Sequence, residues 1–134
     1  EGVHDTALRV LVAGLLDLGL LVGSVEGVIE QGAYRHLYMH RTGHWLGLDV
    51  HDVGAYRLGE HPVALEQGMV LTVEPGLYVS DRLPVPEGQP AIDDRWKGIG
   101  IRIEDDAIVT ATGCELISRG VPVKADEIEA LMRG

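Results

Sequence analysis

The sequence predicts an α+β fold in which helices come first and a curved antiparallel sheet follows. Three observations predict it. Apolar residues recur every three or four positions, which is the spacing of one buried helical stripe; they are Val3, Ala7, Val10, Leu11, Leu15 and Leu18. Short apolar segments, one of them strictly alternating, follow residue 69, and turn residues separate them. Helices followed by a run of closely spaced strands are typical of the α+β class.

The first third of the chain is expected to form two helices. The apolar stripe ends at Gly19, and Ser24 can cap a second helix over residues 25–34. Gly27 and Gly32 weaken this second helix, because each glycine costs about 1 kcal/mol relative to alanine inside a helix.

The middle of the chain is expected to be extended or looped. Leucine and valine alternate with other residues over positions 46–51, which predicts a short strand or an extended loop. Residues 69–74 predict a strand that ends at Pro75-Gly76. Residues 80–98 contain three prolines and predict the most variable loop of the chain.

The last third predicts a meander and a helix. In residues 98–104, three isoleucines occupy one face of a strand, while Gly100, Arg102 and Glu104 occupy the other. Gly98-Ile-Gly100 is interpreted as a close-packing segment rather than a phosphate-binding loop. The sequence then predicts, in order, a turn at residues 105–106, strands over 107–110 and 114–117, and a helix over 124–133.

Composition and length narrow the class of protein. The 134 residues, 46% of them hydrophobic, fit one globular domain over residues 1–134. A net charge of −10 argues against nucleic acid and anionic membranes as partners, and no apolar run approaches the roughly 20 residues of a membrane-spanning helix.

The single cysteine, Cys114, excludes an internal disulfide framework, so a reducing, cytoplasmic location is expected. The chain starts at Glu1 without a signal peptide or an initiating Met, which suggests a piece of a longer protein.

Three of the six histidines lie close together. His40, His44 and His51 fall within twelve residues of a segment spaced by glycines. A single histidine beside apolar residues is usually structural. Three in one glycine-bearing loop make a functional site as reasonable an interpretation as a structural one.

Two glutamates extend this candidate site. Glu74 closes an apolar strand, where it could equally be a solvated charge at the strand exit. Glu104 is either the partner of Arg102 on an exposed face or a buried carboxylate that needs a cation. One imidazole and two carboxylates suit Mn²⁺, Co²⁺, Fe²⁺ or Zn²⁺, and bridging carboxylates permit a pair of ions about 3.5–4 Å apart. Such a pair supplies hydroxide at neutral pH and polarises a carbonyl group, so the pattern predicts a metal-dependent hydrolase.

Three segments resemble successive signatures of one enzyme family. They are HRTGHWLGLDVHDVG at residues 40–54, GMVLTVEPGLY at residues 68–78 and GIGIRIEDD at residues 98–106. In this order and with these gaps, they resemble the Xaa-Pro aminopeptidases (aminopeptidase P) of the pita-bread metallopeptidase family. That family also includes prolidase, methionine aminopeptidase and creatinase. The resemblance covers nearly the whole chain.

The resemblance implies a curved antiparallel sheet backed by helices and a two-metal centre, usually holding Mn²⁺, with Co²⁺ or Zn²⁺ as alternatives. It implies an enzyme that releases the N-terminal residue from peptides with proline in the second position, by a hydroxide that the metal pair activates. By position, the resemblance implies that His44, Glu74 and Glu104 are metal ligands, with Glu104 bridging the two ions, and that Glu74 also transfers a proton. It implies that His40 and His51 bind the substrate and the transition state. Tyr78 and Arg102 are implied to orient these groups.

Two aspartate ligands of the family centre have no counterpart in this sequence. Before His40 only Asp5 and Asp17 occur, both in the helical opening. Residues 1–134 are therefore interpreted as the C-terminal portion of a pita-bread catalytic domain with an incomplete metal site. The chain alone is expected to be inactive, and the longer parent protein to be the peptidase.

Two alternatives remain for the function. Prolidase, an Xaa-Pro dipeptidase, differs in taking dipeptides rather than longer chains. A non-catalytic pita-bread protein would keep the fold as a binding platform, although such proteins typically lose metal ligands. The family often forms homo-oligomers, so self-association is expected here as well.

Overall fold

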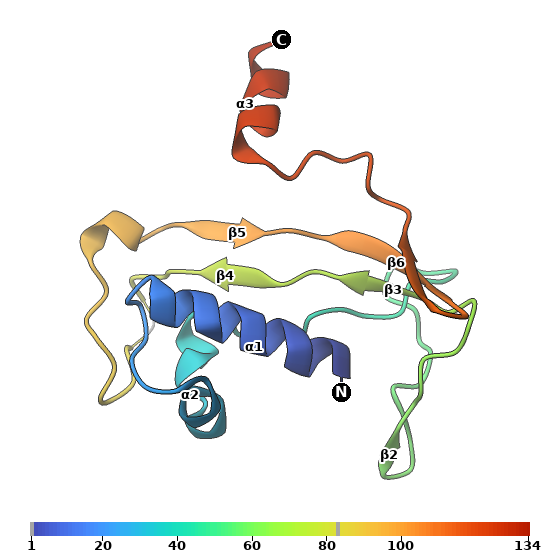
Figure 1. Cartoon of the computed structure of the whole chain (residues 1–134), viewed down its shortest axis with the longest axis horizontal. Helices are drawn as coiled ribbons and strands as arrows, with labels where there is room; N and C mark the ends of the chain where they lie inside the picture. The colour runs from blue at the N-terminus through green and yellow to red at the C-terminus, as the bar shows by residue number, and fades with distance from the viewer. Residues whose placement is uncertain (1, 83) are drawn as a thin grey trace. The chain divides into compact units, whose positions relative to one another are not determined.

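The structure, a computed structural model, describes residues 2–82 and 84–134. The chain divides into two compact units, one made of Glu1–Thr42 and Pro75–Arg102 and the other of Gly43–Glu74 and Ile103–Gly134. Each unit joins helical and antiparallel strand segments (Figure 1), so the predicted α+β class is confirmed. Residue 83, inside the expected variable loop, lies outside the described residues.

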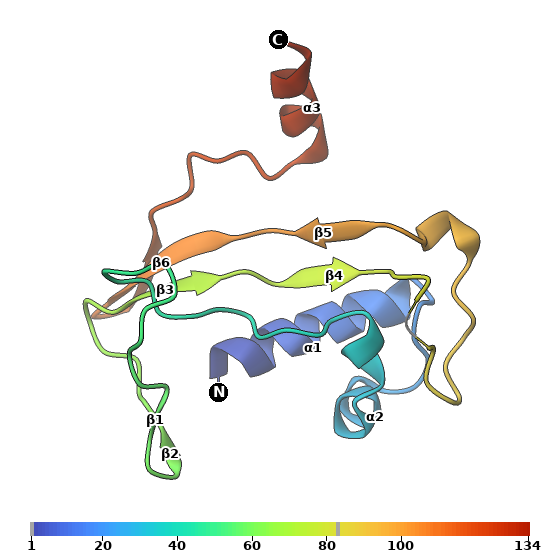
Figure 2. The same cartoon turned by 180° about the vertical axis from the view of Figure 1, so that it is seen from behind.

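The first unit contains helices that precede a two-stranded antiparallel sheet. Its elements are α1 (Gly2–Asp17), α2 (Val25–Gln31), the 3-10 helix η1 (Ala33–His36), β4 (Gly76–Tyr78), the 3-10 helix η2 (Asp94–Trp96) and β5 (Gly100–Arg102). Figure 2 shows α2 and the short η1 beside α1. In the β4–β5 sheet, Tyr78 lies opposite Gly100 and Gly76 opposite Arg102.

The hydrophobic core of this unit forms along α1. The predicted helix forms, but the predicted stripe is only partly buried, since Val10 and Leu18 are 68% and 51% exposed. The observed buried stripe consists of Leu8, Val12 and Leu15, each at most 5% exposed, and only Leu15 belongs to the predicted one. Burial of each such side chain contributes about 1.5–3 kcal/mol of transfer free energy. The stripe packs with residues of α2, of the η1 exit and of β4, so the core reaches the strand that carries Tyr78. The other buried members of the cluster are Leu20, Leu21, Val28, Ala33, Leu37, Tyr38 and Val79.

The second helix begins as expected and ends early. Ser24 caps α2 by accepting a hydrogen bond from the Gly27 amide at 3.1 Å. Gly32 then adopts the left-handed conformation, with φ 68°, and its amide closes the helix on the Ile29 carbonyl. The expected continuation to residue 34 is therefore wrong, and the chain proceeds as the tighter η1 instead.

The second unit is built on a three-stranded antiparallel sheet. Its elements are β1 (Arg57–Leu58), β2 (His61–Pro62), β3 (Val70–Val73), β6 (Asp105–Thr110), β7 (Gly113–Leu116) and α3 (Ala125–Arg133). The sheet has the order β3-β6-β7, and β1 and β2 form a separate short hairpin that the sequence did not predict. The predicted strands over 69–74, 107–110 and 114–117 and the C-terminal helix are confirmed within one to three residues at each end.

One expectation for this unit is wrong, and one alternative is decided. Asp105 and Asp106 do not turn the chain; they pair in β6 with Val73 and Thr72 of β3. Of the two alternatives for residues 46–51, the structure has the loop and not the strand, and its bends leave Leu48 fully exposed. Sheet pairing with β3 explains the first difference, because carboxylates at a strand end can remain half-exposed while their backbone joins the ladder.

No helix in the described part of the chain is long and apolar enough to cross a membrane.

Candidate functional site

The second unit brings together His44, Thr72 and Glu74. The His44 Nε2 atom lies 3.3 Å from Oε1 of Glu74, and both side chains are largely buried. Thr72 lies between them: its hydroxyl donates to Oε1 of Glu74 at 3.0 Å and accepts from the His44 amide at 3.0 Å. The predicted pairing of an imidazole with a carboxylate therefore exists, and a buried threonine fixes both partners.

Backbone pairing explains why His44 reaches Glu74. The Thr72 amide donates to the His44 carbonyl at 2.9 Å, and Trp45 forms an isolated antiparallel bridge with Leu71. Gly43 permits this approach, since a Cβ there would stand 1.9 Å from the Thr72 carbonyl oxygen. A glycine before His44 is thus a steric requirement of the site.

The hydrogen bonds of His44 define its tautomer. Its Nδ1 atom lies 2.9 Å from the Trp45 carbonyl oxygen, which can only accept, so Nδ1 carries the proton. With a neutral ring, Nε2 presents its lone pair towards Oε1 of Glu74, and a cation ligated by both atoms would satisfy the pair. With a protonated ring, Nε2 instead donates to the carboxylate and the contact is an ion pair. An imidazole whose other nitrogen is held by a carbonyl is also the usual arrangement of a metal-binding histidine.

His51 joins this group, and Glu104 does not. The His51 ring lies edge-on to the His44 ring, with centroids 4.1 Å apart, although the His51 side chain is exposed. Glu104 is exposed and lies between the end of β5 and the start of β6. Glu104 is therefore not a buried carboxylate, and both its pairing with Arg102 and its role as a metal ligand stay predictions. Among residues 2–82 and 84–134, no group of three or more His, Cys, Asp or Glu side chains could hold a metal ion.

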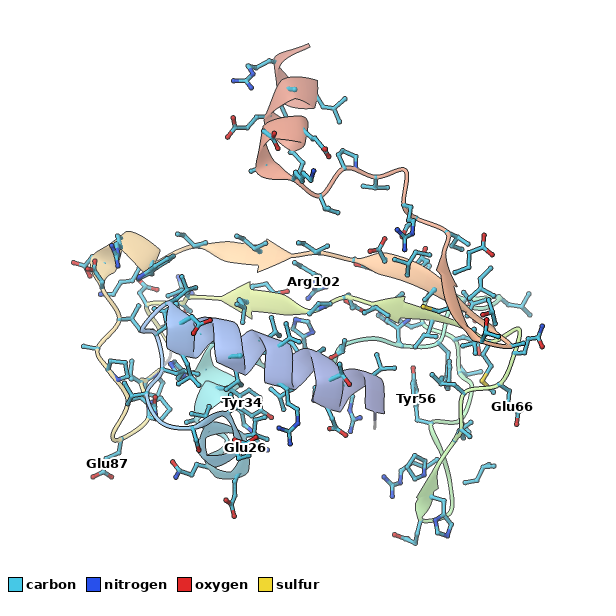
Figure 3. The ribbon with its side chains drawn as sticks, in the orientation of Figure 1. Glu26, Tyr34, Tyr56, Glu66, Glu87 and Arg102 are labelled. Carbon is cyan, nitrogen blue, oxygen red and sulfur yellow. The ribbon has the colours of Figure 1, made fainter. Side chains whose placement is uncertain are left out.

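The first unit holds a second cluster, formed by His40, Tyr78 and Arg102. Figure 3 labels Arg102 on β5. Its Nε donates to the Tyr78 hydroxyl at 2.7 Å, and that hydroxyl lies 3.2 Å from Nε2 of His40. The Arg102 guanidinium also stacks over the Tyr78 ring, 5.7 Å from its centroid. Three residues from distant parts of the sequence thus share one polar network.

This network has a fixed direction of donation. His40 Nδ1 lies 2.7 Å from the Arg41 carbonyl oxygen, so Nδ1 carries the proton and Nε2 accepts. Arg102 can only donate, which leaves the Tyr78 hydroxyl proton free to point at His40. With this tautomer, Nε2 of His40 is the acceptor on the face that Tyr78 contacts.

Glycines make room for the tyrosine in this network. A Cβ at Gly76 would stand 2.5 Å from the Tyr78 hydroxyl oxygen, and one at Gly100 would stand 3.1 Å from the Tyr78 ring. The interpretation of Gly98-Ile-Gly100 as a close-packing segment is confirmed at Gly100 and wrong at Gly98, where an added Cβ would meet no atom within 4 Å. A larger residue at Gly76 or Gly100 would displace Tyr78 from Arg102 and His40.

Sequence reasoning missed Thr72 and the carbonyl of Trp45. Thr72 has a usable signal: it lies two residues before Glu74, so both point to the same face of the strand. A threonine on the buried face, in register with a carboxylate, indicates a hydrogen-bond partner. A backbone carbonyl leaves no such signal in a sequence.

Comparison with known proteins defines the family. The model of metallopeptidase family M24 matches residues 2–111. The chain is 49% identical to the Xaa-Pro aminopeptidase of Haemophilus influenzae and 51% identical to that of Escherichia coli K12, over 96% and 97% of its length. It is 37% identical to human Xaa-Pro dipeptidase over 98% of its length. It spans about 28% of the length of the two bacterial relatives and 31% of the human one.

Solved structures support the same grouping. The chain superimposes on Pseudomonas aeruginosa aminopeptidase PepP with a TM-score of 0.86 at 51% identity, covering 97% of this chain and 28% of that one. It also matches E. coli aminopeptidase P, solved with the inhibitor Pro-Leu and in a zinc-substituted product complex, with a TM-score of 0.77 at 51% identity in each. Those two matches cover 93% of this chain and 27% of each E. coli chain. The chain, with its mixed helices and antiparallel sheets, belongs to metallopeptidase family M24.

Proposed function

We propose that this chain is part of a metal-dependent aminopeptidase that releases the N-terminal residue from peptides with proline in the second position. The observation that carries the proposal is the His44–Glu74 pair, in which an imidazole nitrogen faces a carboxylate oxygen at 3.3 Å. Membership of the metallopeptidase family makes a divalent cation the expected partner of both atoms.

His44 and Glu74 fit such a cation. An imidazole nitrogen and a carboxylate oxygen suit Mn²⁺, Co²⁺ and Zn²⁺, and Thr72 and the Trp45 carbonyl hold both groups in orientation. We propose Glu104 as the third ligand from this chain, on its resemblance to the family motif. The native ion proposed is Mn²⁺. A bound pair of divalent ions would supply Lewis acidity and a nucleophilic water at neutral pH.

The remaining roles follow from the contacts of each residue. Glu74, steadied by the Thr72 hydroxyl, would accept the proton of the attacking water and deliver it to the leaving proline nitrogen. His40 and His51 would bind the peptide and the tetrahedral intermediate. Tyr78 and Arg102 orient His40, so they are positioning residues in this proposal.

An Xaa-Pro dipeptidase is the second candidate, because the human dipeptidase is 37% identical to the chain. The two activities differ in the length of the substrate. The full-length protein that contains this chain should cleave an Xaa-Pro-Xaa tripeptide faster than the matching Xaa-Pro dipeptide. Faster cleavage of the dipeptide would establish the dipeptidase instead.

Metal titration of the 134-residue chain tests the incompleteness of the site. We expect Mn²⁺ binding, measured by calorimetry, to be weak or undetectable, and any binding to fall with His44→Ala. His61→Ala, which alters an exposed histidine of the same unit, is the matched control. Two tight sites in the chain alone would contradict the proposal that further ligands lie elsewhere in the parent protein.

Peptide hydrolysis tests the function itself. The full-length protein with Mn²⁺ should cleave an Xaa-Pro-Xaa peptide, and the 134-residue chain should not. Absence of cleavage by the full-length protein with Mn²⁺, Co²⁺ and Zn²⁺ in turn would favour the non-catalytic alternative. A homo-oligomeric parent, a cytoplasmic location and the assignment of residues 1–134 to one catalytic domain remain predictions.

A further inference from the structure

A cavity of about 470 Å³ opens within the first unit, next to the His40 cluster. Its volume lies within the range of about 300–1,000 Å³ that is typical of small-ligand sites. Its principal side chains are His4, Tyr34, Arg35, Tyr38, His40 and Arg41. Tyr34, labelled in Figure 3, is contributed by η1.

This cavity, here called the arginine pocket, is positively charged. No acidic residue lines it, although the protein carries a net charge of −10. In the part of the chain that the structure describes, neither the Arg35 nor the Arg41 guanidinium forms an ion pair. Burial and then the nearby Arg41 charge lower the pKa of His4, while Asp5, outside the pocket, acts in the opposite direction.

One wall of the arginine pocket is aromatic and held in place. Tyr38 is buried, and its hydroxyl shares a 2.6 Å hydrogen bond with the Thr42 hydroxyl. His4 Nδ1 lies 2.9 Å from the Thr42 hydroxyl oxygen. The Tyr34 and Tyr38 rings are 6.4 Å apart, and His40 stands edge-on to Tyr38 at 5.1 Å. The pocket therefore combines an aromatic surface, held in place by hydrogen bonds, with two guanidinium groups that form no ion pair in the described structure.

His40 connects the arginine pocket to the candidate site. The same imidazole that lines the pocket accepts from the Tyr78 hydroxyl. His40 shares the lining of the pocket with Arg35 and Arg41. The chemistry that matches this surface is an apolar side chain next to a carboxylate, because guanidinium binds carboxylate through paired hydrogen bonds.

We infer that the arginine pocket binds the C-terminal carboxylate of a short peptide, with the side chain of the terminal residue against Tyr34 and Tyr38. This inference rests on the proposed function, since it takes the peptide at His40 to be the substrate or its product. It makes the protein selective for short peptides that end close to His40 as free acids.

The test compares a peptide acid with its amide on the full-length protein that contains this chain. The probes are Pro-Leu and Pro-Leu-amide, which differ only in the terminal charge, and calorimetry gives each Kd. We expect the acid to bind about tenfold more tightly than the amide, which is about 1.4 kcal/mol. In the double variant Arg35→Gln/Arg41→Gln, the ratio of the two Kd values should fall to about one. Arg119→Gln, an exposed arginine of the other unit, should keep the tenfold ratio.

Equal binding of acid and amide by the unmodified protein would overturn the inference, as would a preference that survives in the double variant. Circular dichroism of the double variant checks that it is folded. Cleavage of an Xaa-Pro-Leu-amide by the unmodified protein reports on the proposed function separately, because that peptide has no terminal carboxylate. Cleavage of the amide without acid preference would leave the peptidase standing and remove only the arginine pocket.

Discussion

At the residue scale, Thr72 fixes the geometry of the His44–Glu74 pair. Its hydroxyl is buried and serves two partners at once, the Glu74 carboxylate and the His44 amide. Thr72→Val keeps the shape and the strand preference but leaves both partners without that hydroxyl. We expect a loss of about 1–3 kcal/mol in the free energy of unfolding, measured by urea denaturation.

Thr110→Val is the matched control for this prediction. Thr110 is a half-buried strand threonine in the same unit, and no hydrogen bond of its hydroxyl is present in the described structure. This variant should change stability by less than about 0.5 kcal/mol. Equal losses in the two variants would mean that the Thr72 hydrogen bonds contribute nothing specific.

His36 gives the first unit a pH-dependent stability. The ring is buried, its Nδ1 bonds to the Ala33 carbonyl, and burial lowers the pKa of His36 below its ordinary value of about 6.5. The folded state therefore binds fewer protons than the unfolded state once the pH falls below about 6.5. Stability should be constant above that pH and decline as the pH falls towards the folded-state pKa of His36.

Thermal unfolding between about pH 8 and about pH 5 measures this decline, and His36→Gln should reduce it by removing one titrating group. Part of the decline should remain in the variant, because burial also lowers the pKa of His4. An identical pH dependence before and after the substitution would exclude His36 as a contributor.

At the scale of elements, two glycines of the helical region are expected to respond in opposite ways to alanine. Gly32 ends α2 in the left-handed conformation, and an added Cβ would also stand 3.2 Å from the Arg35 side chain. Gly32→Ala should destabilise the protein by about 1–2 kcal/mol. Gly14 lies inside α1 with open space around it, so Gly14→Ala should stabilise by about 0.5–1 kcal/mol. Thermal unfolding of both variants measures the two shifts, and shifts of the same sign would contradict this account.

The same elements show what the sequence could predict. The helical periodicity of residues 3–18 and the cap at Ser24 are local signals, and the structure confirms the helix and the cap. The buried face of α1 was predicted only in part, because its packing partners decide which apolar side chains are buried. The role of Gly32 was misjudged, because a glycine that weakens a helix interior and one that ends a helix look alike in the sequence. The 105–106 turn was wrong for a different reason: the pairing of β6 with β3 joins residues more than thirty positions apart. Sheet pairing of that kind outweighs local turn propensity.

At the scale of the whole molecule, the sequence predicted the members of the site better than their grouping. It picked out seven residues by type and motif, yet the structure places them in two clusters and leaves Glu104 exposed. Which imidazole faces which carboxylate depends on backbone pairing between residues 44 and 72, a contact with no local signal. The charge of the arginine pocket left no sign in the sequence either, since its two arginines come from η1 and from the segment after it and are six residues apart.

The exposed apolar surface predicts how the 134-residue chain behaves in solution. Within the described residues, β5 pairs only with β4, and its Ile101 is 61% exposed, while Leu48 and Val53 of the other unit are almost fully exposed. A free strand edge beside exposed isoleucine favours pairing with a second chain. We therefore expect concentration-dependent self-association in sedimentation velocity experiments.

Ile101→Lys should weaken this association, because a charge on an edge strand opposes pairing between sheets. Gln31→Lys adds the same charge at an exposed position of α2 and is the matched control. Both substitutions reduce the net negative charge of −10 by the same amount. An equal effect of the two variants on self-association would therefore be an effect of net charge. A monomer at every concentration would show that the isoleucine edge does not pair, whereas a selective effect of Ile101→Lys would identify β5 as the surface through which the chains associate.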